Sequence, residues 1–167
     1  MTTTTMPTWA TLIESLEAEL ESLCRLLRLS ARQRRYLVHR QADRVHANVQ
    51  AMDEVLATLR SANAERRTAL TTLGISSAGR KALKEAATRA DTPARERIEA
   101  LEAALARVTE LLGRKNFQNY QLSRFSLDLV GEEMRLLLGA SDGSGAAYDA
   151  EGAAGDPALR GAVDGRA

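Results

Sequence analysis

The sequence predicts an all-α protein: an elongated antiparallel helical bundle or coiled-coil hairpin of long helices, followed by a disordered C-terminal tail. Aromatic residues make up only 4% of the 167 residues and glycines number only 11, so strong helix formers dominate and little favours a pleated sheet. Large apolar residues recur every seven positions, which is typical of coiled coils. We expect a disordered N-terminus over 1–7, a helical domain over 8–139 and a flexible tail over 140–167.

Two apolar rows run through the first predicted helix, at about 8–40. Gly74 is a favourable stop for a second predicted helix, because glycine adopts the left-handed conformation at little cost. Beyond Ser30 the rows shift by one residue. The first helix therefore either bends or unwinds between Ser30 and Asp43, or breaks there so that Asp43 caps a second helix at about 43–73. The rows are Trp9, Leu16 and Leu23 with Ile13, Leu20 and Leu27, and then Val38, Val45, Met52, Leu59 and Leu73 with Val49, Leu56 and Leu70.

Two more helices are expected after this stop, a short one at about 79–90 and a long one at about 93–138. Thr92 is predicted to cap the long helix, with Pro93 at its first position, where the missing N–H costs nothing. Gly139 is predicted to end it. Its rows are Leu101, Val108, Leu122, Leu129 and Leu136 with Ile98, Leu105 and Leu112, and Lys115 and Asn119 stand at polar positions in the same seam.

Composition and charge indicate a cytoplasmic protein. The net charge is only +1, with a weakly basic body and an acidic tail, so nothing global attracts the chain to DNA or to a membrane surface. Cys24 is the only cysteine, which fits a reducing compartment. No apolar run approaches the roughly 20 residues that span a bilayer, and the N-terminus does not resemble a secretory signal. We therefore expect no membrane insertion.

No pattern in the sequence indicates an enzyme, a metal site or a cofactor. His39 and His46 are seven residues apart, about 10 Å along a helix, which is too far to share one metal ion without a third element. Cys24 stands beside the leucine row, where an inert buried thiol is expected. Carboxylates on one exposed face of the first helix are expected to be solvated rather than catalytic: Glu14, Glu17 and Glu21.

A basic stripe follows on the same predicted helix, between Arg25 and Arg44. Its spacing of three or four residues places it on one face, as phosphate contacts would require. Arginine is abundant throughout the chain, however, and only Tyr36 adds an aromatic residue to the stripe. Nucleic-acid binding is therefore the weaker alternative. The stripe consists of Arg25, Arg28, Arg32, Arg35 and His39, with Arg34, Arg40 and Arg44 nearby.

The last helix carries more apolar residues after Asn119 than one seam can bury. Such a surplus predicts a binding site for an amphipathic helix of a partner, although packing by the other helices on all sides is the alternative. A homodimeric structural coiled coil that binds no client is a second alternative. Polar seam residues can set the helix register in a client-binding bundle and in a homodimer alike. The surplus residues are Leu122, Phe125, Leu127, Leu129, Val130, Met134, Leu136, Leu137 and Leu138, and the polar seam residues are Asn63, Arg66, Lys115 and Asn119.

Three segments, in this order, resemble the FlgN family of flagellar type III export chaperones. The first is Glu65–Gly74, which is similar to the arginine- and leucine-containing close of that family's first arm. The second is Asn116-Phe-Gln-Asn119, which resembles its N-x-x-N element before the last helix. The third is Tyr148–Gly152, which resembles its short tyrosine motif beyond that helix. The resemblance covers most of residues 8–152.

This resemblance implies a chaperone that binds hook-associated proteins of the hook–filament junction, prevents their premature assembly and delivers them to the export gate. It implies that the C-terminal third binds the cargo. It also implies that Tyr148 docks on the cytoplasmic domain of the export gate and that Asn116 and Asn119 are the family motif. The expected cargo-binding residues are Leu122, Phe125, Leu129, Val130, Met134 and Leu137.

Overall fold

The computed structural model describes residues 9–143, with side chains to residue 137, and confirms the all-α prediction. The described residues form four helices and no strand. The predicted N-terminal segment over 1–7 and Tyr148 lie outside them, as does the tail beyond Gly143. The chain divides after Ser123 into two compact units, which are described separately. The helices are α1 (Trp9–Val38), α2 (Ala42–Thr72), α3 (Gly79–Arg89) and α4 (Thr92–Gly143).

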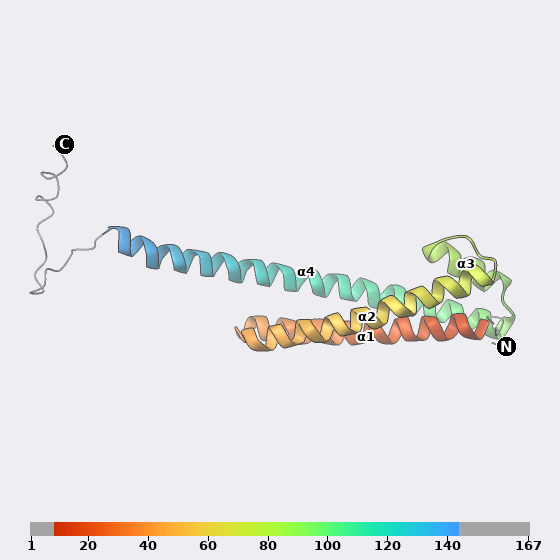
Figure 1. Ribbon diagram of the computed structural model, residues 1–167. Helices are drawn as coiled ribbons and strands as arrows, with labels where there is room; N and C mark the ends of the chain where they lie inside the picture. Colours follow the sequence, from red (N-terminus) through yellow and green to blue (C-terminus); the bar gives the residue numbers. More distant parts are fainter. Residues whose placement is uncertain (1–8, 144–167) are drawn as a thin grey trace, which may run out of the picture. The chain divides into compact units, whose positions relative to one another are not determined.

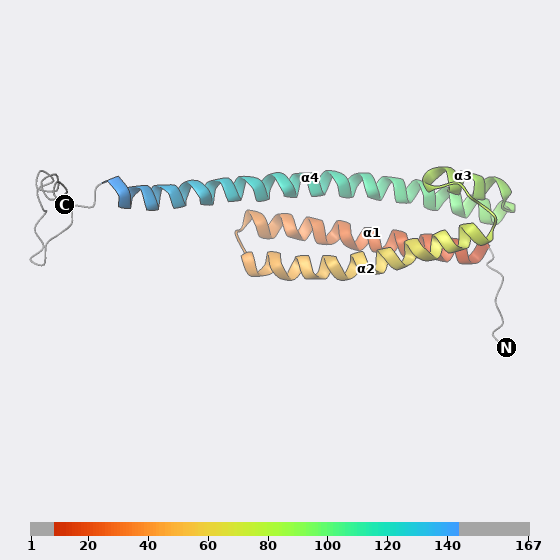
Figure 2. The same cartoon turned by 45° about the horizontal axis from the view of Figure 1, so that its top comes forward.

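In the first unit, α1 and α2 form an antiparallel hairpin, and the first part of α4 runs alongside α1 (Figure 1). The turned view shows the short α3 beside the start of α4 (Figure 2). Ion pairs link these helices: Arg97 on α4 binds Glu17 on α1, and Arg80 on α3 binds Glu102 on α4. The first unit is thus a bundle in which α1 touches both other long helices.

The helix breaks between α1 and α2, so the second of the two alternatives left open by the sequence is the correct one. Arg40 adopts a left-handed φ of 53°, which reverses the chain over three residues. The predicted cap is wrong, because α2 begins at Ala42 after Gln41, which makes no capping side-chain hydrogen bond. Asp43 lies inside the first turn instead, where its charge still favours the positive end of the helix dipole.

Gly74 ends α2 in the left-handed conformation, with φ 70°, as predicted. The N–H of Ile75 donates to the Leu70 carbonyl at 2.9 Å, and the Gly74 N–H donates to that of Thr71 at 3.0 Å. This pair of bonds is the Schellman motif, which satisfies carbonyls left free at the helix end. Ile75 itself is only 3% exposed, so the motif also anchors the following loop in the core.

Both predicted ends of α4 need correction. Asp91 rather than Thr92 caps the helix, because its Oδ1 accepts the Ala94 N–H at 3.3 Å, and Thr92 is already helical. At the other end Gly139 does not stop the helix, which continues to Gly143. Glycine ends a helix only where it adopts the left-handed conformation. Because the right-handed helical conformation is equally accessible to glycine, a helix can also continue through it.

The buried face of α1 is only partly the one that its large apolar residues predicted. Leu16 and Leu23 are buried as expected, whereas Trp9, Ile13 and Leu20 are half-buried at its edge. Serines occupy central positions instead. The hydroxyls of Ser15 and Ser22 are satisfied by carbonyls of their own helix, and Ser15, for example, donates to the Leu12 carbonyl at 2.8 Å. The buried residues are Leu12, Ser15, Leu16, Glu19, Ser22, Leu23, Leu26 and Ser30.

On α2 the seven-residue row that is buried differs from the predicted one. It consists of Asn48, Val55, Ala62 and Ala69. Of the predicted rows only Leu70 is buried as expected. Met52, Leu56 and Leu59 pack half-buried at the edges, and Val49 is exposed, as is Val38 at the end of α1. Counting only large apolar residues misses this row, because alanine at a helix contact lets two backbones approach closely while larger neighbours cover the flanks.

A buried ion pair crosses the hairpin. Arg66 Nη1 on α2 donates to Glu19 Oε2 on α1 at 2.8 Å, and the two side chains are 20% and 12% exposed. Burial raises the pKa of the Glu19 carboxyl, and the Arg66 charge opposes this rise without cancelling it. Breaking such a pair leaves one uncompensated charge in the interior, so it fixes which turn of α1 faces which turn of α2.

Candidate functional site

Large apolar side chains lie exposed along α4, in the region where the sequence predicted a partner site. Among the other described residues, only Val38 and Val49 are large, apolar and exposed. Exposed apolar surfaces of this kind are typical of protein-binding sites. The exposed residues of α4 are Phe117, Tyr120, Phe125, Leu127, Val130, Met134, Leu136 and Leu137.

Four of the six expected cargo-binding residues are among them. Phe125, Val130, Met134 and Leu137 are 68%, 54%, 52% and 72% exposed. The other two, Leu122 in the first unit and Leu129 in the second, are half-buried.

The prediction omitted four equally exposed residues. Leu127 and Leu136 were counted among the surplus apolar positions but were not assigned to the site, although both are more than 60% exposed. Phe117 lies within the asparagine motif and Tyr120 directly follows it, and only the two asparagines of this segment were predicted to have a role. The spacing of three residues between Phe117 and Tyr120, on the side of the helix away from buried Asn119, is the signal that could have found them.

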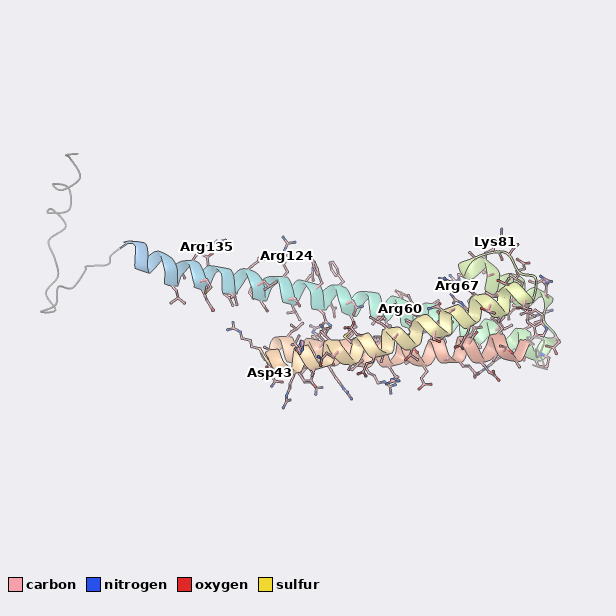
Figure 3. The ribbon with its side chains drawn as sticks, in the orientation of Figure 1. Asp43, Arg60, Arg67, Lys81, Arg124 and Arg135 are labelled. Atoms are coloured by element: carbon pink, nitrogen blue, oxygen red, sulfur yellow. The ribbon has the colours of Figure 1, made fainter. Side chains whose placement is uncertain are left out.

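Within the second unit, four of the five charged residues between Arg124 and Leu137 gather on one narrow side of α4. At 100° per residue, Arg124, Asp128, Glu132 and Arg135 span only about 80° of the helix circumference. Arg135 also binds Glu132 at 3.0 Å, and the two arginines are labelled on this stretch of helix in Figure 3. Most of the remaining circumference is apolar, broken by Glu133 and Ser126. A stripe of about 100° suffices to pack on a core, so this segment can contact a partner along several sides.

The two asparagines of the predicted motif lie where α4 contacts the second half of α1. Asn119 is 4% exposed, and its Nδ2 donates to the Ser30 carbonyl at 2.8 Å and to Ser30 Oγ at 3.1 Å. Ser30 Oγ donates in turn to Asn116 Oδ1 at 2.8 Å. Both asparagines therefore hold α4 against α1. The buried Oδ1 of Asn119 has no hydrogen-bond partner, which makes this polar contact costly for its size.

The arginines of the basic stripe do not all face the same surroundings. Arg34 donates to Gln118 Oε1 on α4 at 2.7 Å, and Arg44 stacks over the Tyr36 ring at 5.9 Å from its centroid. Three others, Arg25, Arg28 and Arg32, line one side of a shallow groove of about 330 Å³ between α1 and α2. The structure therefore divides the stripe into residues that hold the fold and residues that face outward.

The residues considered for catalysis or metal binding are dispersed. Among the described residues, no three histidine, cysteine or acidic side chains are grouped closely enough to hold a metal ion. His39 and His46 are exposed, and His46 contacts Gln50. Cys24 is half-buried rather than fully buried as expected. No helix within residues 9–143 combines the length and the apolar character that crossing a bilayer requires.

These features define a class: a helical protein whose exposed apolar helix is suited to binding another protein. Comparison with family models gives a match to "FlgN protein" over residues 6–155. The chain belongs to the FlgN family, and it is a flagellar export chaperone in the general sense that this membership implies. The family is one of chaperones rather than enzymes, and its members bind flagellar hook-associated proteins. Comparisons with curated proteins and with solved structures gave no significant match.

Proposed function

We propose that this chain is a cytoplasmic chaperone that binds the hook-associated proteins of the hook–filament junction, prevents their premature assembly and delivers them to the export gate. The observation that carries the proposal is the exposed apolar surface of α4, in a chain of the FlgN family. Such a surface suits the apolar face of an amphipathic helix of a client, and covering that face would keep client molecules from associating through it.

The cargo site is assigned to the second unit of α4, with Phe125, Val130 and Met134 as its centre. No side chain between Arg124 and Leu137 is buried, so this segment does not serve as core in the described structure. An amphipathic client helix that lays its apolar face here would remove several large side chains from water. Each buried anchor contributes on the order of 1–3 kcal/mol.

The experiment is a triple substitution of these anchors, Phe125→Ala, Val130→Ala and Met134→Ala. Alanine removes the apolar side chains and retains the helix propensity of the segment. Binding of a C-terminal fragment of a hook-associated protein, measured by calorimetry, should weaken by at least about 100-fold, since three anchors worth about 1 kcal/mol each give this factor.

The matched control replaces the two exposed valines outside α4, with Val38→Ala and Val49→Ala. These positions are 57% and 38% exposed, so the control also removes exposed apolar surface. It should leave client affinity unchanged. If the triple variant still binds the client as the parent does, or if the control weakens binding equally, the cargo site does not lie on this segment.

A further inference from the structure

The outward face of α1 carries a segregated row of charges that the proposed function does not use. Within this row Glu17 also binds Arg97 on α4, and Arg28 and Arg32 line the groove beside α2. Because α1 is continuous to Val38, the exposed glutamates of its first half and the arginines of its second half lie on one helix, as predicted. At 100° per residue they also lie on one face, opposite the buried residues of α1. We call this face the charged row. It consists of Glu14, Glu17 and Glu21 in the first half of α1 and of Arg28, Arg32 and Arg35 in the second half.

The two halves of the charged row mirror each other about a point between Cys24 and Arg25. Glu21 and Arg28 each lie about one helical turn from this point, which is about 5 Å along the axis. Glu17 and Arg32 each lie about two turns away, and Glu14 and Arg35 about three. Every acidic residue therefore has a basic counterpart at the same distance on the other side.

We propose that the charged row is a self-association surface, on which two copies of this chain pair their α1 helices in antiparallel orientation about a two-fold axis. Under such an axis, each residue meets the counterpart at the same distance on the other side. Glu21 then faces Arg28 of the partner, Glu17 faces Arg32, and Glu14 faces Arg35. Each contact forms twice, so the interface contains six unlike-charge pairs.

The charges select the orientation of the pair. A parallel arrangement would bring the acidic halves together and the basic halves together, and like charges across an interface are repelled. Five of the six residues are exposed, and Glu17 is half-exposed while it binds Arg97 on its own α4. Charged groups in this environment contribute little individually and are screened by salt. The dimer is therefore weak and dependent on ionic strength.

This surface goes beyond the proposed chaperone function and does not depend on it. It uses α1, whereas the proposed client uses α4. It also gives the outward part of the basic stripe a partner of defined chemistry, namely the glutamates of a second copy. Nucleic acid would interact with the arginines alone and would not benefit from the matching row of glutamates.

Sedimentation equilibrium of the full chain at about 0.01 M and about 1 M salt tests the proposal first, since the Debye length falls from about 30 Å to about 3 Å over this range. We expect a concentration-dependent dimer at low salt and a monomer at high salt. Glu21→Arg alone or Arg28→Glu alone turns two attractive contacts into repulsive ones, and each should weaken the dimer by about tenfold or more. The double variant Glu21→Arg/Arg28→Glu restores both contacts and should regain the dimer.

Cys24 provides an independent readout, because it stands next to the proposed axis and is half-buried. A short bis-maleimide should link two copies through Cys24 at low salt, and Arg28→Glu should abolish this link. As a control, the reactive cysteine is moved to an exposed position on α2 with Cys24→Ser/Ser61→Cys, which should not cross-link. A chain that stays monomeric at low salt, or a double variant no better than either single variant, would overturn the proposal. So would an effect of Arg28→Glu that Glu21→Arg does not share.

Discussion

Several side chains buried between the helices are polar, and their partners determine which helical turns meet. Asn48 Nδ2 on α2 donates to the Leu29 carbonyl on α1 at 3.1 Å, and Ser30 is held by the two asparagines of α4. Glu19 is held by Arg66. Buried polar groups add little net stability even when satisfied, but a shifted arrangement would leave them unpaired. At the scale of single residues, they favour one register of the bundle over its alternatives.

Glu19 should make part of the stability depend on pH in the direction opposite to an ordinary ion pair. Its pKa is raised in the folded state, chiefly by burial, so the folded state binds the proton more tightly than the unfolded state. Its contribution is then fully present below the unfolded pKa and is lost as the pH rises above about 4. We expect the free energy of unfolding of the parent, minus that of Glu19→Gln, to fall between pH 4 and pH 7.

This difference can be measured by urea unfolding followed by circular dichroism at several pH values. Glu96→Gln, which replaces an exposed carboxylate of α4, is the matched control for the loss of one glutamate. If the difference for Glu19→Gln rises with pH, or equals that of the control throughout, the burial of Glu19 does not have the effect assigned to it.

The contact between Ser30 and Asn119 gives a second prediction at this scale. Asn119→Ala removes the three hydrogen bonds that its Nδ2 donates to Ser30 and Gln33 and leaves a void. It should therefore lower the free energy of unfolding by about 1–2 kcal/mol. Replacing both partners, with Ser30→Ala/Asn119→Leu, also removes the unsatisfied Oδ1 and fills the space with an apolar side chain. The double variant should be close to neutral or stabilising. Urea titrations decide this, and a double variant as unstable as Asn119→Ala would contradict it.

At the scale of the helices, the ends are determined by backbone chemistry rather than by the apolar rows. Arg40 reverses the chain after α1, Gly74 closes α2, and Asp91 begins α4. Each acts locally, through a left-handed conformation or through a side-chain oxygen that accepts an otherwise free N–H. The lengths of the helices follow from these few positions.

Two glycines with different conformations should therefore respond in opposite ways to alanine. Gly113 is helical, exposed and has open space around an added Cβ, so Gly113→Ala should raise the free energy of unfolding by about 0.5–1 kcal/mol. Gly74 has φ +70°, so Gly74→Ala should lower it by about 1 kcal/mol or more. Thermal unfolding measures both. If Gly113→Ala lowers the free energy of unfolding, or if Gly74→Ala leaves it unchanged, backbone conformation does not determine the effect of alanine at these positions.

At the scale of the whole molecule, the residues that hold the fold and the residues proposed to bind the client are separate. Buried side chains occur in the first unit, of which Asn119 is the last along the chain, and none occurs between Arg124 and Leu137. Substitutions in the second unit should consequently affect binding without unfolding the bundle. This separation allows the cargo test to be interpreted, because loss of binding and loss of fold are distinct outcomes.

Tyr148, which lies outside the described residues, is proposed to contact the export gate and not the cargo. An aromatic residue beyond the cargo helix can reach a second partner while the first stays bound. We expect Tyr148→Ala to leave client affinity within about twofold, which is a few tenths of a kcal/mol, but to weaken binding to the cytoplasmic domain of the gate and to slow export. Titrating the variant against both partners measures this. An unchanged affinity for the gate, or an equal loss for the client, would exclude this role.

The amino-acid sequence alone determined the fold class, the two glycine- and proline-marked regions between helices and the apolar surplus on the last helix. These features depend on residues that are near in sequence. They follow from helix propensity, from the left-handed preference of Gly74, and from a run of apolar residues that exceeds what one seam can bury. The family resemblance could likewise be drawn from short segments such as Asn116–Asn119, and the family match confirms it.

Only the tertiary structure decided which faces of α1 and α2 are buried, whereas on α4 the predicted residues Ile98, Leu101 and Leu105 are buried as expected. The row through Asn48, Val55, Ala62 and Ala69 is inconspicuous in the sequence because alanine and asparagine are not counted as core residues. Such residues are buried because a neighbouring helix approaches closely and supplies a hydrogen-bond partner, and that neighbour is distant in sequence. For the same reason, the face of α1 that carries the mirrored charges could be identified as outward only after its opposite face had been shown to pack.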